Sequence, residues 1–140
     1  RPSDDEVAVN MVNGIMGRMH LASDLGKLTP QQTELVRLGV AKAKQLAAFR
    51  RTAVPWLPFG FARFGDKKAA VGLMDEKEML LGVWGLGAMQ FDVPLPRSAA
   101  SCHVFYPVKD AVSVRAEGKT LHLRFERNTA AVLQIVFADF

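Results

Sequence analysis

The chain has 140 residues, of which 49% are hydrophobic and 23% are charged, and its formal net charge is +4. This composition is typical of a globular domain and excludes a disordered tail, and no apolar run is long enough for a transmembrane helix. The single cysteine, Cys102, excludes an internal disulfide and a Cys/His zinc site. The positive charge would support nucleic-acid binding only if it were gathered on one face, so we expect neither a nucleic-acid nor a membrane partner.

The first residues of the chain do not look like the start of a protein. The sequence begins at Arg1 without Met, and residues 1–6 lack the cationic start and apolar stretch of a signal peptide. We therefore expect the chain to begin inside a longer protein. The sequence does not indicate the cellular compartment.

A first helix is predicted from Ser3 onward. Ser3 and Glu6 have the spacing of a capping box, in which the hydroxyl and the carboxylate each bond a backbone amide. Apolar residues follow at helical spacing: Ala8, Met11, Val12, Ile15, Met16 and Met19. Gly14 and Gly17 weaken this helix towards its end, and residues 18–25 could form a last turn or a short strand.

A second helix has a stronger start signal. Thr29 stands at the N-cap position, Pro30 at the first helical position and Gln32 at the third. Leu35, Leu38, Leu46 and Phe49 then lie near one face. Pro55 ends the helix at about residue 53. Residues 54–63 form a connector rich in proline and aromatic residues, which is too hydrophobic to be a flexible linker.

The remainder of the chain predicts β-structure. Residues 88–93 alternate between apolar and polar side chains, and Pro94 stops this strand. Residues 112–125 alternate on both sides of Glu117-Gly118, which predicts a hairpin. The run Ala131–Phe137 is apolar enough for a central strand. About seven short strands indicate an antiparallel β-sandwich. The predicted fold class is therefore α+β, with an N-terminal helical segment followed by this sandwich.

Few residues are candidates for chemistry. His20, His103 and His122 have no spacing that predicts a metal site, and Cys102 alternates into the apolar set of its strand. Trp56 and Trp84 could be platforms on which sugars stack, or they could pack in a core. The basic pairs at residues 50–51 and 67–68 look like solvated ends of elements. Without a phosphate-cradling glycine loop, we expect no nucleotide cofactor, and no other cofactor or metal is indicated.

One passage resembles a known family. Residues 19–25, Met-His-Leu-Ala-Ser-Asp-Leu, followed by Leu28-Thr29-Pro30, resemble the last strand and the start of the final helix in the (β/α)8 barrel of melibiase-type α-galactosidases, glycoside hydrolase families 27 and 36. The connector Val54–Gly60 resembles the step out of that barrel. The order of motifs in the family's C-terminal sandwich is matched by Val71-Gly72-Leu73, Leu80–Trp84, Val93–Pro96 and Val104–Pro107.

The resemblance implies a division into three parts. Residues 1–53 would be the last helix–strand–helix of a catalytic barrel, residues 54–63 the connector, and residues 64–140 a complete accessory sandwich. The parent enzyme would hydrolyse terminal α-galactosides by a retaining mechanism, which needs two carboxyl groups about 5–5.5 Å apart. In this family both are aspartates from earlier barrel strands, and the nucleophile follows Lys and an aromatic residue. No aspartate here has that context, so we expect no catalytic residue in this chain and no activity of the chain alone.

The resemblance also implies a site and partners. Ser23 and Asp24 would lie at the mouth of the parent barrel, where substrate binds, although Asp24 could instead only cap the loop before the second helix. The partners would be the rest of the barrel and, in the parent enzyme, an oligosaccharide. Four apolar residues would normally face a barrel sheet: Met11, Ile15, Leu35 and Leu38. We therefore expect the chain either to self-associate through an exposed helical face or to hide that face.

Two other readings of the sequence stay open. One is a stand-alone carbohydrate-binding β-sandwich module with a helical extension, which aromatic residues exposed on one sheet face would favour. The other is a basic nucleic-acid-binding domain, which a contiguous Lys/Arg face would favour.

Overall fold

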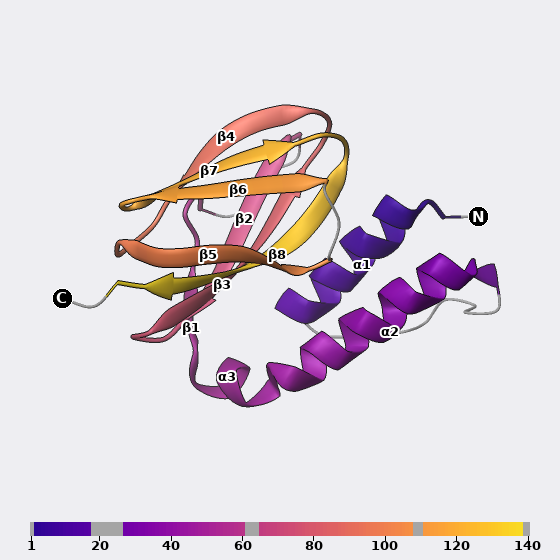
Figure 1. Ribbon diagram of the computed structural model, residues 1–140, viewed down its shortest axis with the longest axis horizontal. Helices are drawn as coiled ribbons and strands as arrows, with labels where there is room; N and C mark the ends of the chain where they lie inside the picture. Colours follow the sequence, from indigo (N-terminus) through magenta and orange to yellow (C-terminus); the bar gives the residue numbers. More distant parts are fainter. Residues whose placement is uncertain (1, 18–26, 61–64, 108–110, 139–140) are drawn as a thin grey trace.

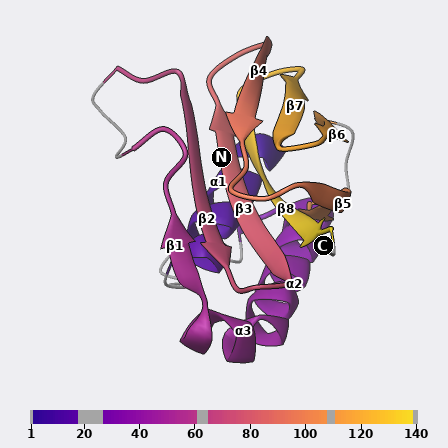
Figure 2. The same cartoon turned by 90° about the vertical axis from the view of Figure 1, so that its left-hand side faces the viewer.

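The computed structural model describes residues 2–17, 27–60, 65–107 and 111–138, and it has three layers (Figures 1 and 2). One layer holds the helices α1 (Asp4–Met16) and α2 (Pro30–Gln45), and α2 leads into the short α3 (Ala47–Thr52). The other two layers are β-sheets. Helices followed by antiparallel strands in two sheets confirm the predicted α+β fold with a β-sandwich.

The strands divide unequally between the two sheets, and every neighbouring pair is antiparallel. The five-stranded sheet has the order β1 (Val54–Trp56), β2 (Lys68–Met74), β3 (Glu78–Gly85), β8 (Thr129–Phe137), β5 (Ala99–Tyr106). The three-stranded sheet has the order β4 (Met89–Pro94), β7 (Thr120–Phe125), β6 (Val112–Glu117). The described residues form eight strands, against the predicted number of about seven. The additional strand is β1, which lies within the predicted connector.

Local capping fixes the start of both long helices. The Ser3 hydroxyl accepts a hydrogen bond from the Glu6 amide at 3.1 Å. At α2 both halves of the predicted capping box are present: the Thr29 hydroxyl accepts from the Gln32 amide, and the Gln32 side chain accepts from the Thr29 amide, each at 3.1 Å. These bonds satisfy backbone donors that a helix leaves unpaired at its first turn.

The first hydrophobic core lies between the two sheets. Alternate side chains of β7 point into it, and Phe125 stacks on Phe91 of β4 with ring centroids 5.5 Å apart. Gly118 closes the turn that joins β6 to β7. Its φ of 60° suits glycine, which has no β-carbon to oppose this conformation. The predicted hairpin over residues 112–125 is therefore confirmed.

The second core lies on the opposite face of the five-stranded sheet, between β3, β8 and the two long helices. Leu80 and Val132 face α1 there, and both are buried. Because β8 has a core on each side, almost all of its residues are buried, which confirms the prediction of a central strand. The Tyr106 hydroxyl completes this core by donating a buried hydrogen bond of 2.9 Å to the Leu35 carbonyl of α2.

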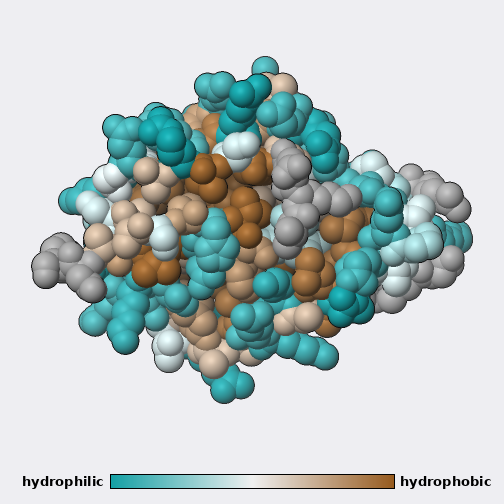
Figure 3. Space-filling model, viewed as in Figure 1, coloured by the Kyte–Doolittle hydropathy of each residue, from teal (hydrophilic) through white to brown (hydrophobic). Residues whose placement is uncertain are grey.

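The apolar side of the helices is therefore covered. Met11, Ile15 and Leu35 are all buried, and Leu38 is partly buried against the same core. The helical face is thus hidden rather than exposed, because the outer face of the five-stranded sheet packs on it, and self-association stays a prediction. Figure 3 shows one side of the molecule, where apolar residues are gathered mainly over the middle and hydrophilic residues surround them. Within the described residues, no helix combines the length and apolarity needed to cross a membrane.

Candidate functional site

The residues that the family resemblance singled out cannot be placed. Ser23 and Asp24 lie outside the described residues, as does His20. Their position at a barrel mouth stays a prediction.

The other histidines and the cysteine have ordinary structural surroundings. His103 is exposed on β5, and His122 lies at the surface of the three-stranded sheet with Nδ1 2.7 Å from Oδ1 of Asp92. Cys102 packs against the sandwich core, and burial raises the pKa of its thiol to about 11. In the part of the chain that the structure describes, no group of three or more His, Cys, Asp or Glu side chains is arranged to hold a metal ion.

Trp56 packs against a core, which is one of the two roles that the sequence left open for it. It lies on the edge strand β1, is partly buried against the sandwich core, and its β-carbon approaches Gly72 of β2. A β-carbon on Gly72 would be 3.2 Å from that atom, so the contact depends on the glycine. Trp56 therefore closes one edge of the sandwich.

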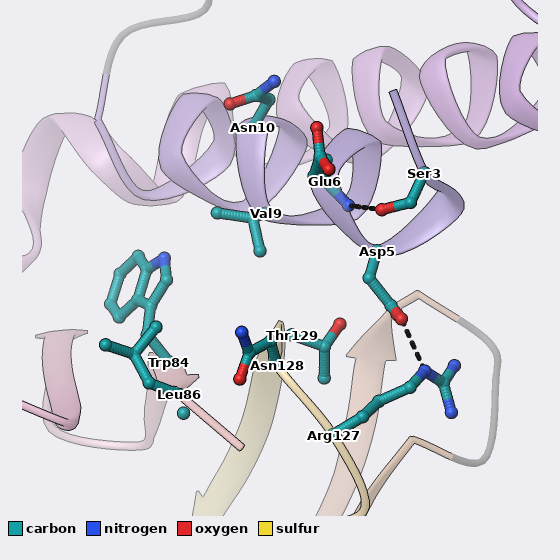
Figure 4. Close-up of a pocket in the computed structure, with 11 residues that line it drawn as sticks. Ser3, Asp5, Glu6, Val9, Asn10, Trp84, Leu86, Arg127, Asn128 and Thr129 are labelled. Carbon is teal, nitrogen blue, oxygen red and sulfur yellow. Dashed lines mark hydrogen bonds and ion pairs between the residues drawn. The ribbon is translucent and has the colours of Figure 1, made fainter. Parts of the chain in front are cut away.

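A cleft of about 590 Å³ lies between α1 and the turns at one end of the five-stranded sheet (Figure 4). Its walls come from the exposed side of α1, from the end of β3 and from the turn between β7 and β8. We refer to it as the α1 cleft. Its lining residues are Ser3, Asp5, Glu6, Val9, Asn10, Trp84, Gly85, Leu86, Arg127, Asn128 and Thr129.

The apolar part of the α1 cleft is built around Trp84. The indole Nε1 donates a hydrogen bond of 2.8 Å to Oδ1 of Asn13 on α1, and the ring lies across Gly82, where a β-carbon would be 2.8 Å from it. Val9 of α1 lies above, and Leu86 lies beside Trp84 with 59% of its surface exposed. The indole is thus held in one orientation with part of its surface towards the cleft.

The polar part of the α1 cleft contains one ion pair and several groups that can form hydrogen bonds. Arg127 bonds the Asp5 carboxylate, and this bond raises the pKa of the guanidinium. Glu6 and Asn10 project from α1, and Asn128 lies on the turn between β7 and β8 (Figure 4). The paired charges of Asp5 and Arg127 largely offset each other, so the exposed Glu6 carboxylate leaves the lining with a small negative balance.

Sequence reasoning found one residue of this cleft and missed the rest. Trp84 was a candidate for sugar stacking, and the structure places it at the wall. Asn10 and Asn128 are far apart in the chain and line the same cleft because α1 packs across the ends of β3 and β8. The sequence signal for Asn10 was the polar side of the first predicted helix, and Asn128 had no such signal.

No protein-family model matches the chain, and no curated protein matches it.

Proposed function

We propose that this chain is the C-terminal accessory part of a retaining glycoside hydrolase resembling α-galactosidase, an enzyme that hydrolyses terminal α-galactosides. In this proposal the sandwich supports the last helices of the catalytic barrel, and the rest of the barrel is the main partner. Ser23 and Asp24 would lie at the barrel mouth and contribute to oligosaccharide binding in the whole enzyme. The proposal starts from the ordered set of sequence motifs.

The observation that supports it is the core shared by the helices and the five-stranded sheet. A supporting domain must hold the helices it supports, and here Leu80 and Val132 bury their side chains against α1. The buried Tyr106–Leu35 hydrogen bond ties the same sheet to α2. Because their apolar side is buried against the sandwich, the helices would meet the rest of the barrel through their remaining faces.

The first test of the proposal is the coding sequence upstream of Arg1, which should encode a (β/α)8 pattern with two suitably placed carboxylates. The longer protein should hydrolyse an aryl α-galactoside, whereas the 140-residue chain should not. In the longer protein, Leu80→Ala should lower the temperature of thermal inactivation and leave kcat/KM of the surviving enzyme unchanged. Turnover by the short chain, abolished by replacing one of its aspartates, would refute the proposal.

A stand-alone carbohydrate-binding module is the second candidate, and the α1 cleft with its Trp84 wall favours it. The upstream sequence separates the two, because a free-standing module needs no barrel.

Self-association is also part of the proposal, but it has less support now that Met11, Ile15 and Leu35 are buried. Light scattering over a range of concentrations tests it directly, and a constant monomer mass would exclude it.

A further inference from the structure

We infer that the α1 cleft is a binding site for a neutral saccharide, with Trp84 as the wall against which the sugar ring stacks. This inference rests on the cleft alone and holds whether or not the chain belongs to a glycoside hydrolase. It assigns a ligand class to a cleft whose described lining residues were not singled out as substrate-binding by the family resemblance.

The size and shape of the cleft suit a small ligand. Its volume of about 590 Å³ falls within the range of about 300–1,000 Å³ that is usual for small-molecule sites. Its walls come from a helix, the end of β3 and the short turn between β7 and β8, which hold side chains more firmly than long loops do. The bond from Trp84 to Asn13 fixes the indole before any ligand arrives, so little side-chain freedom is lost on binding.

The apolar wall matches one side of a sugar ring. A pyranose has a face made of C–H groups and an edge made of hydroxyl groups, and an indole offers a flat apolar surface to the first. Trp84, Val9 and the exposed Leu86 form such a surface along one side of the cleft. A single exposed leucine does not by itself indicate a binding site. Leu86, however, lines the same cleft as Trp84, whose orientation is fixed.

The polar wall matches the hydroxyl edge. A sugar hydroxyl donates one hydrogen bond and accepts others, and a carboxamide offers donors and an acceptor in the same group. Asn10 lines the cleft from α1 and Asn128 lines it from the turn between β7 and β8, so both contribute carboxamides, and Glu6 of α1 adds an acceptor. The three side chains are exposed.

The charge balance argues against other small ligands. A phosphate would meet the Glu6 carboxylate, and Arg127, the one cation among the described lining residues, is already bonded to Asp5. A quaternary ammonium ion binds best among several aromatic rings, and the described part of the lining contributes Trp84 alone. A neutral polyhydroxylated ligand satisfies both walls without burying a charge.

The binding test uses Trp84 as its own reporter. The chain has two tryptophans, so the Trp56→Phe variant leaves Trp84 as the only one. This variant is titrated with melibiose, maltose, cellobiose and lactose while indole fluorescence is recorded. We expect a saturable change with at least one disaccharide, with a Kd between about 0.1 and 10 mM, as suits a small ligand making few contacts. The absence of saturable change with all four sugars at about 100 mM, well above that range, would overturn the inference.

Variants locate the site. In the Trp56→Phe background, Asn10→Ala and Asn128→Ala should each weaken binding by about threefold to tenfold, the equivalent of one lost hydrogen bond. Both side chains are exposed, so their melting temperatures should stay unchanged. Gln90→Ala, on the exposed face of β4 outside the cleft, is the matched control and should bind as before. Unchanged affinity in both asparagine variants would overturn the assignment to this cleft.

The ligand class has its own controls. Inorganic phosphate and spermidine are titrated under the same conditions, and neither should displace the bound disaccharide. Displacement by either one, with the same loss in Asn128→Ala, would show that the cleft selects charge and would overturn the neutral-saccharide assignment.

Discussion

Replacing Leu80 tests whether the helices and the sandwich form one cooperative unit. Leu80 lies on the face of β3 that points away from the sandwich core, and it is 1% exposed because α1 covers it. If the helical layer did not pack there, the same side chain would lie at the surface of the five-stranded sheet. The Leu80→Ala substitution therefore has a cost only if the three-layer arrangement is correct.

The expected cost follows from the burial of the side chain. Replacing a fully buried leucine by alanine typically destabilises a protein by about 2–5 kcal/mol, which combines the lost transfer free energy with the cavity left behind. We expect about 3 kcal/mol for Leu80, because its neighbours in the second core can relax only in part. In a chain of this length, that corresponds to a Tm lower by about 10 °C.

The assay is urea unfolding followed by indole fluorescence and by far-ultraviolet circular dichroism. Leu86→Ala is the matched control, since Leu86 is 59% exposed and its replacement should change the free energy of unfolding by less than about 0.5 kcal/mol. The two probes should report one transition in the wild-type chain. A cost for Leu80→Ala no larger than that for Leu86→Ala would show that the helices do not pack on this sheet.

Three further substitutions test other parts of the structure. Tyr106→Phe keeps the ring but removes the buried hydrogen bond to the Leu35 carbonyl, so chemical denaturation should show a loss of about 1 kcal/mol, and an unchanged stability would contradict this bond. Gly85→Ala places a β-carbon 2.7 Å from the ring of Phe125, which should destabilise the chain by about 1–3 kcal/mol; the added substitution Phe125→Leu should recover part of this loss, and an unchanged Tm would contradict the close approach. Burial raises the pKa of Cys102 from 9.0 to about 11, so the thiol ionises at lower pH in the unfolded chain than in the folded one. The free energy of unfolding should therefore fall as pH rises from about 9 to 11, and Cys102→Ala should reduce this decline. Alkylation by iodoacetamide at pH 8 should be slow until urea unfolds the chain, and fast alkylation of the folded chain would show that the thiol is not buried.

Features set by neighbouring residues could be predicted from the sequence. The capping box at Thr29, the hairpin around Gly118 and the central position of β8 each depend on a short run of residues. The start of the edge strand β1 could not be predicted in this way. Pro55 lies inside β1, and proline is usually a sign that strand pairing stops, but an edge strand needs hydrogen bonds on only one side.

Features set by the packing of distant segments could not be predicted. The apolar pattern of the helices indicates that one face is buried, but it does not specify the surface that covers it. The covering surface is the second face of β3 and β8. The clue to it was the continuous apolar run of β8, because a strand with only one buried face would alternate between apolar and polar residues. The α1 cleft follows from the same packing, which brings Asn10 and Trp84 together across more than half of the chain.

The position of β8 has a consequence for how the protein is synthesised. It follows every other described element in the chain, yet it lies between β3 and β5 and contributes side chains to both cores. A nascent chain that has not yet released β8 from the ribosome would carry β3 and β5 as unpaired edges, and neither core could close. Such edges readily pair with other chains. We therefore expect the nascent chain to be prone to pairing with other chains until β8 has left the ribosome.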